Sequence, residues 1–92
     1  MSKMDITINH AAGLHARPAS KFVQTAASFP CNLMVRNKTN DGKMVNAKSI
    51  LSVLTLGVDQ GCVIEIEASG DKENEALAAL KELIESNFGE EN

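Results

Sequence analysis

The chain has 92 residues, a length that accommodates a single domain spanning residues 1–92. A domain of this size buries only about 60% of the surface of its unfolded chain, so we expect any chemistry to lie near the surface. The formal net charge is −3, from 9 basic and 12 acidic residues, and Trp and Tyr are absent. These features argue against nucleic-acid binding, which normally needs a basic face or aromatic side chains for base stacking.

Membrane, secretory and metal-binding classes are also disfavoured. No apolar run approaches the roughly 20 positions of a membrane span, and the N-terminal segment lacks the apolar region of a signal peptide. Cys31 and Cys62 are too few for a disulfide framework, and we expect both to be reduced core thiols on neighbouring strands. The two histidines, His10 and His15, and the two cysteines show no zinc-binding spacing. We therefore expect a cytoplasmic protein without a metal or a cofactor.

The first two predicted elements are a strand and a helix. Residues 4–9 alternate between apolar and polar side chains, which is typical of a half-buried strand. Pro18 suits the first turn of the helix that follows, and Pro30 stands just past its end. The helical apolar stripe comprises Ala19, Phe22, Val23, Ala26 and Ala27.

A hairpin and a short helix follow. Alternation predicts a strand over 31–36 and a short returning strand over 43–46. The polar segment 37–42 between them ends in Asp-Gly, a strong turn signal, and predicts a surface loop. Residues 48–56 have helical apolar spacing and are followed by Gly57, which indicates a short helix, with a strand as the alternative because Val53 and Thr55 are β-branched.

The remaining sequence predicts a fourth strand over 62–68 and a last helix with Asp71 as its N-cap and Gly89 at its end. The apolar stripe of this helix comprises Ala76, Leu77, Leu80, Leu83, Ile84 and Phe88. The order β-α-β-β-α-β-α predicts an α+β two-layer sandwich, an antiparallel sheet with helices on one face. The other face of the sheet would be polar and carry Asp5, Thr7, Asn32, Arg36, Glu65 and Glu67.

The candidate site is the segment 13–18, which reads GLHARP and stands at the start of the first predicted helix. The first backbone N–H groups of a helix lack partners within the helix and attract anions. Arg17 adds a guanidinium that suits phosphate, and the helix dipole favours the neutral, nucleophilic form of His15. These features indicate a transiently phosphorylated histidine, and the alternative is a capping histidine beside a surface arginine.

The longer segment GLHARPA at 13–19 resembles the active-site motif of the HPr family. These are the histidine-containing phosphocarrier proteins of the phosphoenolpyruvate-dependent sugar phosphotransferase system. VNAKSI at 45–50, LG at 56–57, QG at 60–61 and ASGD at 68–71 extend the resemblance over essentially the whole chain. The resemblance implies a strand order of 1-4-2-3 with three helices on one face.

The resemblance also implies a role for each residue of the motif. His15 would accept a phosphoryl group on Nδ1 from phosphorylated enzyme I and pass it to a histidine on the A domain of a sugar-specific enzyme II. Arg17 would stabilise the phosphoryl group, and the backbone N–H groups of Ala16 and Arg17 would hold its oxygens. The protein would then be a carrier rather than a stand-alone catalyst.

Ser49 is a second candidate site. By position it is a conventional N-cap for the second predicted helix. The resemblance matches it to the regulatory serine that HPr kinase/phosphorylase modifies, in a context similar to the Gram-positive branch of the family. Phosphorylation of Ser49 would weaken docking to enzyme I and would allow binding to a catabolite control repressor.

The second predicted helix also supplies the candidate docking surface. A short helix cannot bury every apolar side chain, so we expect Ile50 and Leu51 to be exposed and Val53 and Leu56 to lie in the core. The resemblance makes this helix the docking site for the partners, and a monomer would leave it free. The residues expected to dock are Arg17, Lys48, Ile50, Leu51 and Leu54.

A regulatory HPr-like paralogue that only binds a kinase or a transcription factor is the alternative function. The intact pair of His15 and Arg17 favours the carrier over this binding module. A nitrogen-regulatory carrier and a small acid-anhydride hydrolase rank lower. The loop 37–42 is longer than is usual in the family, and we expect it to be a surface insertion far from the site. We expect His10 to be a loop residue, or at most a contact at the rim.

Overall fold

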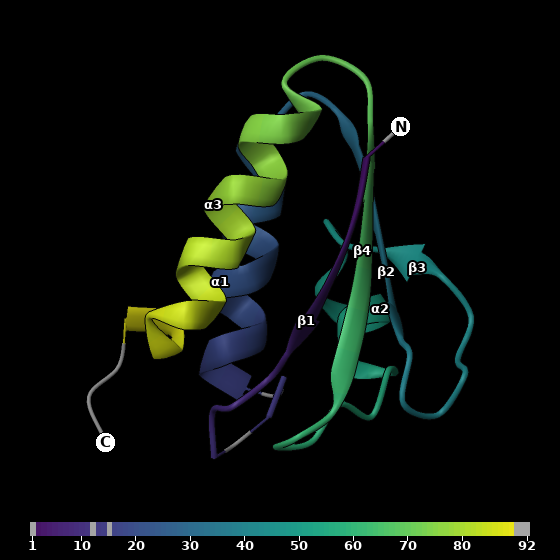
Figure 1. The fold of residues 1–92 in the computed structure, drawn as a ribbon, viewed down its shortest axis with the longest axis vertical. Coiled ribbons are helices and arrows are strands. Elements are labelled where there is room, and N and C mark those ends of the chain that lie inside the picture. The colour runs from purple at the N-terminus through teal and green to yellow at the C-terminus, as the bar shows by residue number, and fades with distance from the viewer. Residues whose placement is uncertain (1, 12, 15, 90–92) are drawn as a thin grey trace.

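The computed structural model describes residues 2–11, 13–14 and 16–89, and four of its segments form one antiparallel sheet in the order β1-β4-β2-β3. The strands are β1 (Ser2–Thr7), β2 (Asn32–Asn37), β3 (Val45–Asn46) and β4 (Val63–Ser69). The helices are α1 (Ala16–Ala27), α2 (Ile50–Leu54), α3 (Glu73–Glu85) and the short 3₁₀ turn η1 (Asn87–Gly89). The helices cover one face of the sheet, which confirms the predicted sandwich and strand order (Figure 1). None of the helices in this part of the chain is long and apolar enough to cross a bilayer.

The centre of the sheet is β4, which pairs with β1 on one side and with β2 on the other. Its residue Ile66 lies opposite Met4 of β1 and opposite Val35 of β2. The side chains of Ile64, Ile66 and Ala68 are buried, and those between them are only half-buried. The predicted alternation over 62–68 is therefore confirmed, and its buried face forms the floor of the core.

The first helix covers this floor with most of its predicted stripe. Phe22 and Ala26 are completely buried, and Val23 is packed against the core. Ala27 is exposed, so its prediction as a core residue is wrong. The reason is that Ala27 is the last residue of α1 and lies at the edge of the stripe, where the chain turns away from the sheet.

The start of α3 also differs from the prediction. Its N-cap is Lys72, with φ +63°, and not Asp71, and the Lys72 side chain makes no capping hydrogen bond. The carboxylate of Glu73 accepts a hydrogen bond from the backbone N–H of Gly70 instead, at 3.3 Å. A side chain of the first turn thus bonds to the preceding loop, and no side-chain cap hydrogen bond is present at the N-cap.

The long hairpin loop is tied to the sheet at its start. Asn37 is the last residue of β2 rather than part of the loop, and only 2% of it is exposed. The Lys38 N–H donates to the carbonyl of Val63 at 2.9 Å, and the Val63 N–H donates to Thr39 Oγ1 at 2.7 Å. The prediction of a surface loop over 37–42 is therefore wrong for the buried Asn37, whereas Lys38 and Thr39 are exposed and their hydrogen bonds to Val63 tie the loop to β4.

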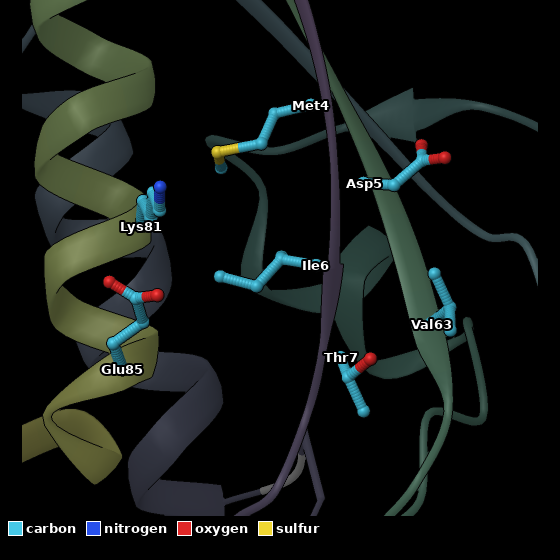
Figure 2. A pocket seen from close by; sticks show the side chains of 7 residues that line it. All are labelled: Met4, Asp5, Ile6, Thr7, Val63, Lys81 and Glu85. Carbon is cyan, nitrogen blue, oxygen red and sulfur yellow. The ribbon is translucent and has the colours of Figure 1, made fainter.

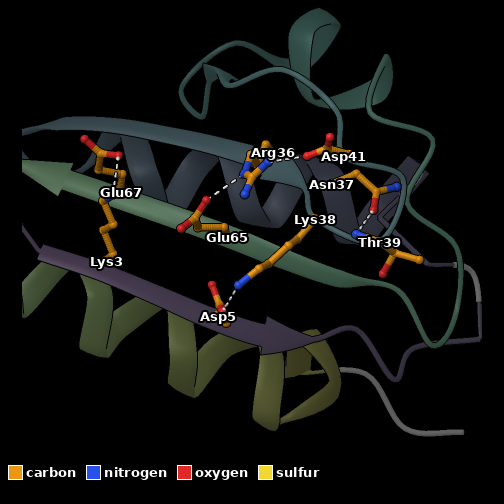
Figure 3. Close-up of polar contacts among 9 residues, drawn as sticks. All are labelled: Lys3, Asp5, Arg36, Asn37, Lys38, Thr39, Asp41, Glu65 and Glu67. Atoms are coloured by element: carbon orange, nitrogen blue, oxygen red, sulfur yellow. Dashed lines mark hydrogen bonds and ion pairs between the residues drawn. The ribbon is translucent and has the colours of Figure 1, made fainter.

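The face of the sheet away from the helices is polar, as predicted, and its charges are paired (Figure 3). Arg36 Nε donates to Glu65 Oε1 at 2.6 Å, and this hydrogen bond raises the pKa of Arg36 above its usual value. Lys38 pairs with Asp5 and so links the hairpin loop to β1. The first pair joins β2 to β4, and the second joins the residue after β2 to β1. Opposite charges on this face of the sheet therefore lie next to each other.

The two cysteines lie at opposite ends of the sheet. Cys31 is buried just before β2, and Cys62 is half-buried just before β4. Since β2 and β4 are antiparallel, residues that precede them cannot be neighbours. Cys31 is a core thiol, as predicted, whereas Cys62 is half-buried and packs against the core from the opposite end of the neighbouring strand.

Candidate functional site

The predicted phosphoryl acceptor, His15, lies outside the residues that the structure describes, but its flanking segments are placed. Leu14 is buried, and its N–H donates to the carbonyl of Val58 at 2.9 Å. On the other side α1 begins at Ala16, Arg17 is exposed in its first turn, and Pro18 is buried. The candidate site therefore stands where a fixed loop enters a helix, with an exposed guanidinium beside it.

Backbone hydrogen bonds hold the loop before α1 against the turn that precedes β4. The Ile8 N–H donates to Cys62 at 2.9 Å, and the Gly61 N–H donates back to Ile8 at 2.7 Å. Gly13 has φ +64°, and a Cβ at this position would lie 2.3 Å from the Val58 carbonyl oxygen. Only glycine fits such a close approach, so the glycine of the motif shapes the loop rather than the phosphate site itself.

His10 is part of this support and not a rim residue. It lies in the loop, as predicted, but only 7% of it is exposed. Its ring meets the edge of Phe88 in a T-shaped contact, with centroids 5.7 Å apart and an interplanar angle of 79°. The sequence reasoning missed this contact because no local pattern relates the two residues.

The predicted docking helix α2 presents its apolar side chains to solvent. Ile50, Leu51 and Leu54 are 38%, 75% and 38% exposed, and they are the exposed large apolar residues in the described part of the chain. Val53 is completely buried and Leu56 is buried, as predicted. We call Ile50, Leu51 and Leu54 the α2 patch. An exposed apolar cluster of this kind is typical of a surface that binds another protein.

Side chains fix both ends of α2. At its start, Ser49 is the N-cap, and its Oγ accepts a hydrogen bond from the Ser52 N–H at 3.4 Å. Lys48 is half-buried, and its Nζ donates to the carbonyl of Phe29 at 2.6 Å, just past the end of α1. At the other end, Asn37 Nδ2 donates to the carbonyl of Leu56 at 3.2 Å. Neither the Lys48 contact nor the Asn37 contact was anticipated from the sequence.

These contacts also orient α2 relative to the candidate site. The N-terminal end of α2 faces the end of α1 through Lys48 and Phe29. The chain that leaves α2 reaches the loop before α1, where Val58 accepts the hydrogen bond from Leu14. Ser49 therefore lies at the end of α2 nearer the end of α1, and the residues after α2 lie nearer the loop before α1.

A pocket elsewhere on the surface contains none of the predicted site residues. It lies between β1 and α3, and Figure 2 shows Met4 and Ile6 directed toward α3, where Lys81 and Glu85 stand. Asp5 points to the opposite face of the sheet. This pocket brings together no nucleophile and no anion-binding pair, so we assign it no part in the candidate site.

Comparison with known proteins agrees with the fold. The family described as "PTS HPr component phosphorylation site" matches residues 2–86. The phosphocarrier protein HPr of Xylella fastidiosa is 41% identical over 91 residues, with 99% of both chains covered. That of Neisseria meningitidis is 43% identical over 90 residues, with 98% of both chains covered.

Solved structures show the same relationship. The crystal structure of HPr-C-His from Thermoanaerobacter tengcongensis is 51% identical and covers 100% of both chains, with a TM-score of 0.93. HPr from Bacillus anthracis is 36% identical, covers 90% of this chain and 95% of its own, and has a TM-score of 0.83. The chain therefore belongs to the HPr family, the phosphocarrier proteins of the phosphotransferase system.

Proposed function

We propose that this phosphocarrier accepts a phosphoryl group on His15 from phosphorylated enzyme I and passes it to the A domain of a sugar-specific enzyme II. The observation that carries the proposal is the burial of His10 against Phe88, because the chain has only two histidines. His10 is thereby withdrawn from an incoming donor, which leaves His15 as the acceptor. His15 also falls within the residues matched by a family that is described by its phosphorylation site.

The chemistry of the transfer follows from the residues around position 15. The Nδ1 atom of neutral His15 attacks the phosphorus, and the bond from phosphorus to the donor breaks as the new N–P bond forms. The exposed guanidinium of Arg17 stabilises the charge on the phosphoryl oxygens, together with the backbone N–H groups of Ala16 and Arg17. The bond energy comes from phosphoenolpyruvate, so the protein acts as a carrier and not as an independent catalyst.

Docking of both partners is assigned to the α2 patch, with Arg17 and Lys48 at its rim. The joint exposure of Ile50, Leu51 and Leu54 on one short helix supports this assignment, because a cluster of exposed apolar side chains is typical of a protein-binding surface. The Lys48 ammonium is held by the Phe29 carbonyl, so a partner would meet it in a fixed place. We propose that the chain works as a single cytoplasmic domain over residues 1–92 and as a monomer, which keeps the patch free.

Phosphorylation of Ser49 by HPr kinase/phosphorylase is the regulatory part of the proposal. Ser49 adjoins Ile50 and Leu51 but stands at the end of α2 away from the loop that enters α1. A phosphate there would place negative charge next to the α2 patch. We therefore propose that it weakens docking to enzyme I, and that the phosphorylated form binds a catabolite control repressor.

The test of the carrier function is the intact mass of the protein after incubation with phosphoenolpyruvate and enzyme I. We expect one acid-labile phosphoryl group on the wild-type protein and none on His15→Ala. Retention of the group by His15→Ala would overturn the assignment of His15. If the wild-type protein acquires no group from an enzyme I that phosphorylates another HPr, the regulatory paralogue replaces the carrier as the function.

A further inference from the structure

We infer that Phe88 is a positioning residue for phosphoryl transfer, because it holds together the two segments that flank position 15. The inference rests on the proposed role of His15 and adds to it a residue from the far end of the chain. Phe88 lies in η1, after the last helix, and only 1% of it is exposed. Figure 1 shows η1 at the end of the molecule where α1 begins.

One residue contacts both flanking segments. The Phe88 ring meets His10, in the loop before position 15, with centroids 5.7 Å apart. The Phe88 carbonyl accepts a hydrogen bond from Lys21 Nζ, in the helix after position 15, at 2.8 Å. The ring and the carbonyl of Phe88 therefore couple the loop to α1 from the side that faces η1.

Two successive residues of η1 have left-handed backbone angles. Asn87 and Phe88 both have φ +59°, in the left-handed region. A bulky residue is rare in that region, because its Cβ is crowded there, and it persists only when its surroundings determine it strongly. The reversal after α3 turns the Phe88 side chain into the core, where it is almost completely buried.

Backbone hydrogen bonds connect His10 to the residues that precede position 15. The His10 carbonyl accepts a hydrogen bond from the Gly13 N–H at 2.8 Å, and the next residue, Leu14, is bound to Val58 at 2.9 Å. His10 is thus bonded to Gly13, and Gly13 and Leu14 are the described residues that directly precede position 15 in the sequence. A nucleophile that is held in a reactive orientation reacts faster than one that must first find it, so removal of the ring should slow the chemical step.

The experiment compares full-length wild-type protein with Phe88→Ala, Phe88→Leu and Leu77→Ala as substrates of enzyme I and phosphoenolpyruvate. Leu77 is a buried apolar residue near the start of α3, so Leu77→Ala matches the loss of core burial far from η1. We expect Phe88→Ala to lower kcat for phosphoryl acceptance by about fivefold or more, with KM within about twofold of wild type, because the α2 patch is untouched. Phe88→Leu should be intermediate, since it keeps the apolar volume but loses the ring contact.

A second readout does not depend on activity. In NMR spectra, the amide signals of Gly13 and Leu14 should shift in both Phe88 variants and stay in place in Leu77→Ala. An unchanged kcat in Phe88→Leu, which is the variant better able to fold, would overturn the inference, and so would a rise in KM alone. If Leu77→Ala changed kcat and the amide signals as much as Phe88→Ala does, the inference would also be overturned, because Phe88 would then contribute only to overall stability. Failure of the wild-type protein to become phosphorylated would instead remove the proposed function itself.

Discussion

At the scale of single residues, Gly13 is a position in the loop before α1 that admits no side chain. Gly57 has nearly the same φ, +65° against +64°, but no atom lies within 4 Å of its would-be Cβ. Alanine at either position incurs the left-handed backbone cost of about 1–2 kcal/mol. Only Gly13→Ala must also displace the Val58 carbonyl, so we expect it to lower the free energy of unfolding by clearly more than Gly57→Ala. Urea unfolding of the two variants measures this difference. Equal losses of unfolding free energy would mean that the Val58 carbonyl can move aside at no energetic cost.

The buried side chain of Asn37 forms hydrogen bonds to the chain just after the docking helix α2. Its Nδ2 donates to the carbonyls of Leu56 and Gly57 at 3.2 Å and 3.4 Å, and its Oδ1 accepts from Thr39. Asn37→Ala removes this donor from carbonyls at the end of α2, and the expected loss of stability is about 1–3 kcal/mol.

Asn32→Ala is the matched control for this prediction, because Asn32 is exposed at the other end of the same strand. Its expected effect is within about 0.5 kcal/mol. Thermal or urea unfolding compares the two variants. If Asn37→Ala costs no more than Asn32→Ala, the hydrogen bonds to α2 contribute nothing to stability.

The residues that could be predicted from the sequence are those whose signal is local. The start of α1 within the motif at 13–18 is confirmed, with Arg17 exposed in its first turn, and the role of the motif's histidine stays a prediction. The contacts of His10 with Phe88 and of Lys48 with the Phe29 carbonyl join residues that are distant in the sequence. Such contacts depend on how the elements pack, which a pattern of apolar spacing does not contain.

At the scale of the elements, apolar spacing identified the sheet strands and the three longer helical segments, and it failed at their ends. Asp71 is a favourable N-cap residue, yet Lys72 caps α3 and Glu73 reaches back to Gly70. Val45–Asn46 is the whole of β3, although the alternation suggested 43–46. The ends of elements are decided by competition among side chains for a few free backbone groups, and several candidates satisfy the same local rule.

The substitution Ser49→Asp tests whether charge at the start of α2 weakens docking. Aspartate is as good an N-cap as serine, so the helix should be retained while negative charge is added beside Ile50 and Leu51. We expect the KM of enzyme I for this variant to rise by about fivefold, with kcat little changed, since the charge is added beside the docking residues. Steady-state phosphorylation assays give both constants.

Ser49→Asn is the uncharged control, because asparagine keeps the size and the capping ability of aspartate. It should behave as the wild-type protein does. A similar rise in KM for Ser49→Asn would assign the effect to shape rather than to charge, and an unchanged KM for Ser49→Asp would count against the regulatory role of Ser49.

At the scale of the whole molecule, the resemblance gave the order of the strands and the alternation did not. Alternating residues identify four strands with one buried face each, but several orders of these strands would bury the same faces. The position of β4 between β1 and β2 depends on long-range pairs such as Met4 with Ile66 and Val35 with Ile66. The exposure of the α2 patch is also a property of the whole molecule, because it reflects what the other elements leave uncovered.

Glu73 connects the start of α3 to the start of β1. The hydroxyl of Ser2, at the start of β1, donates to Glu73 Oε2 at 2.6 Å, and the N–H of Gly70 donates to Oε1 at 3.3 Å. These hydrogen bonds, with that from Ser2 the larger cause, lower the pKa of Glu73 below its usual value of 4.5. The first strand and the last helix are thus held together by a carboxylate that must stay ionised.

The sign of the resulting pH dependence follows from this lowered pKa. Near pH 4.5 the unfolded chain binds a proton at Glu73 more readily than the folded chain, so the contribution of Glu73 to stability is present above that pH and is lost as the pH falls through the folded pKa. We expect Glu73→Gln to be less stable than wild type at neutral pH and to lose less stability on acidification. Glu75→Gln, which alters another acidic residue in the same first turn of α3, should keep the wild-type slope. Urea unfolding across a pH series gives the slopes, and a Glu73→Gln curve parallel to that of the wild-type protein would show that the closure at Ser2 does not depend on the charge.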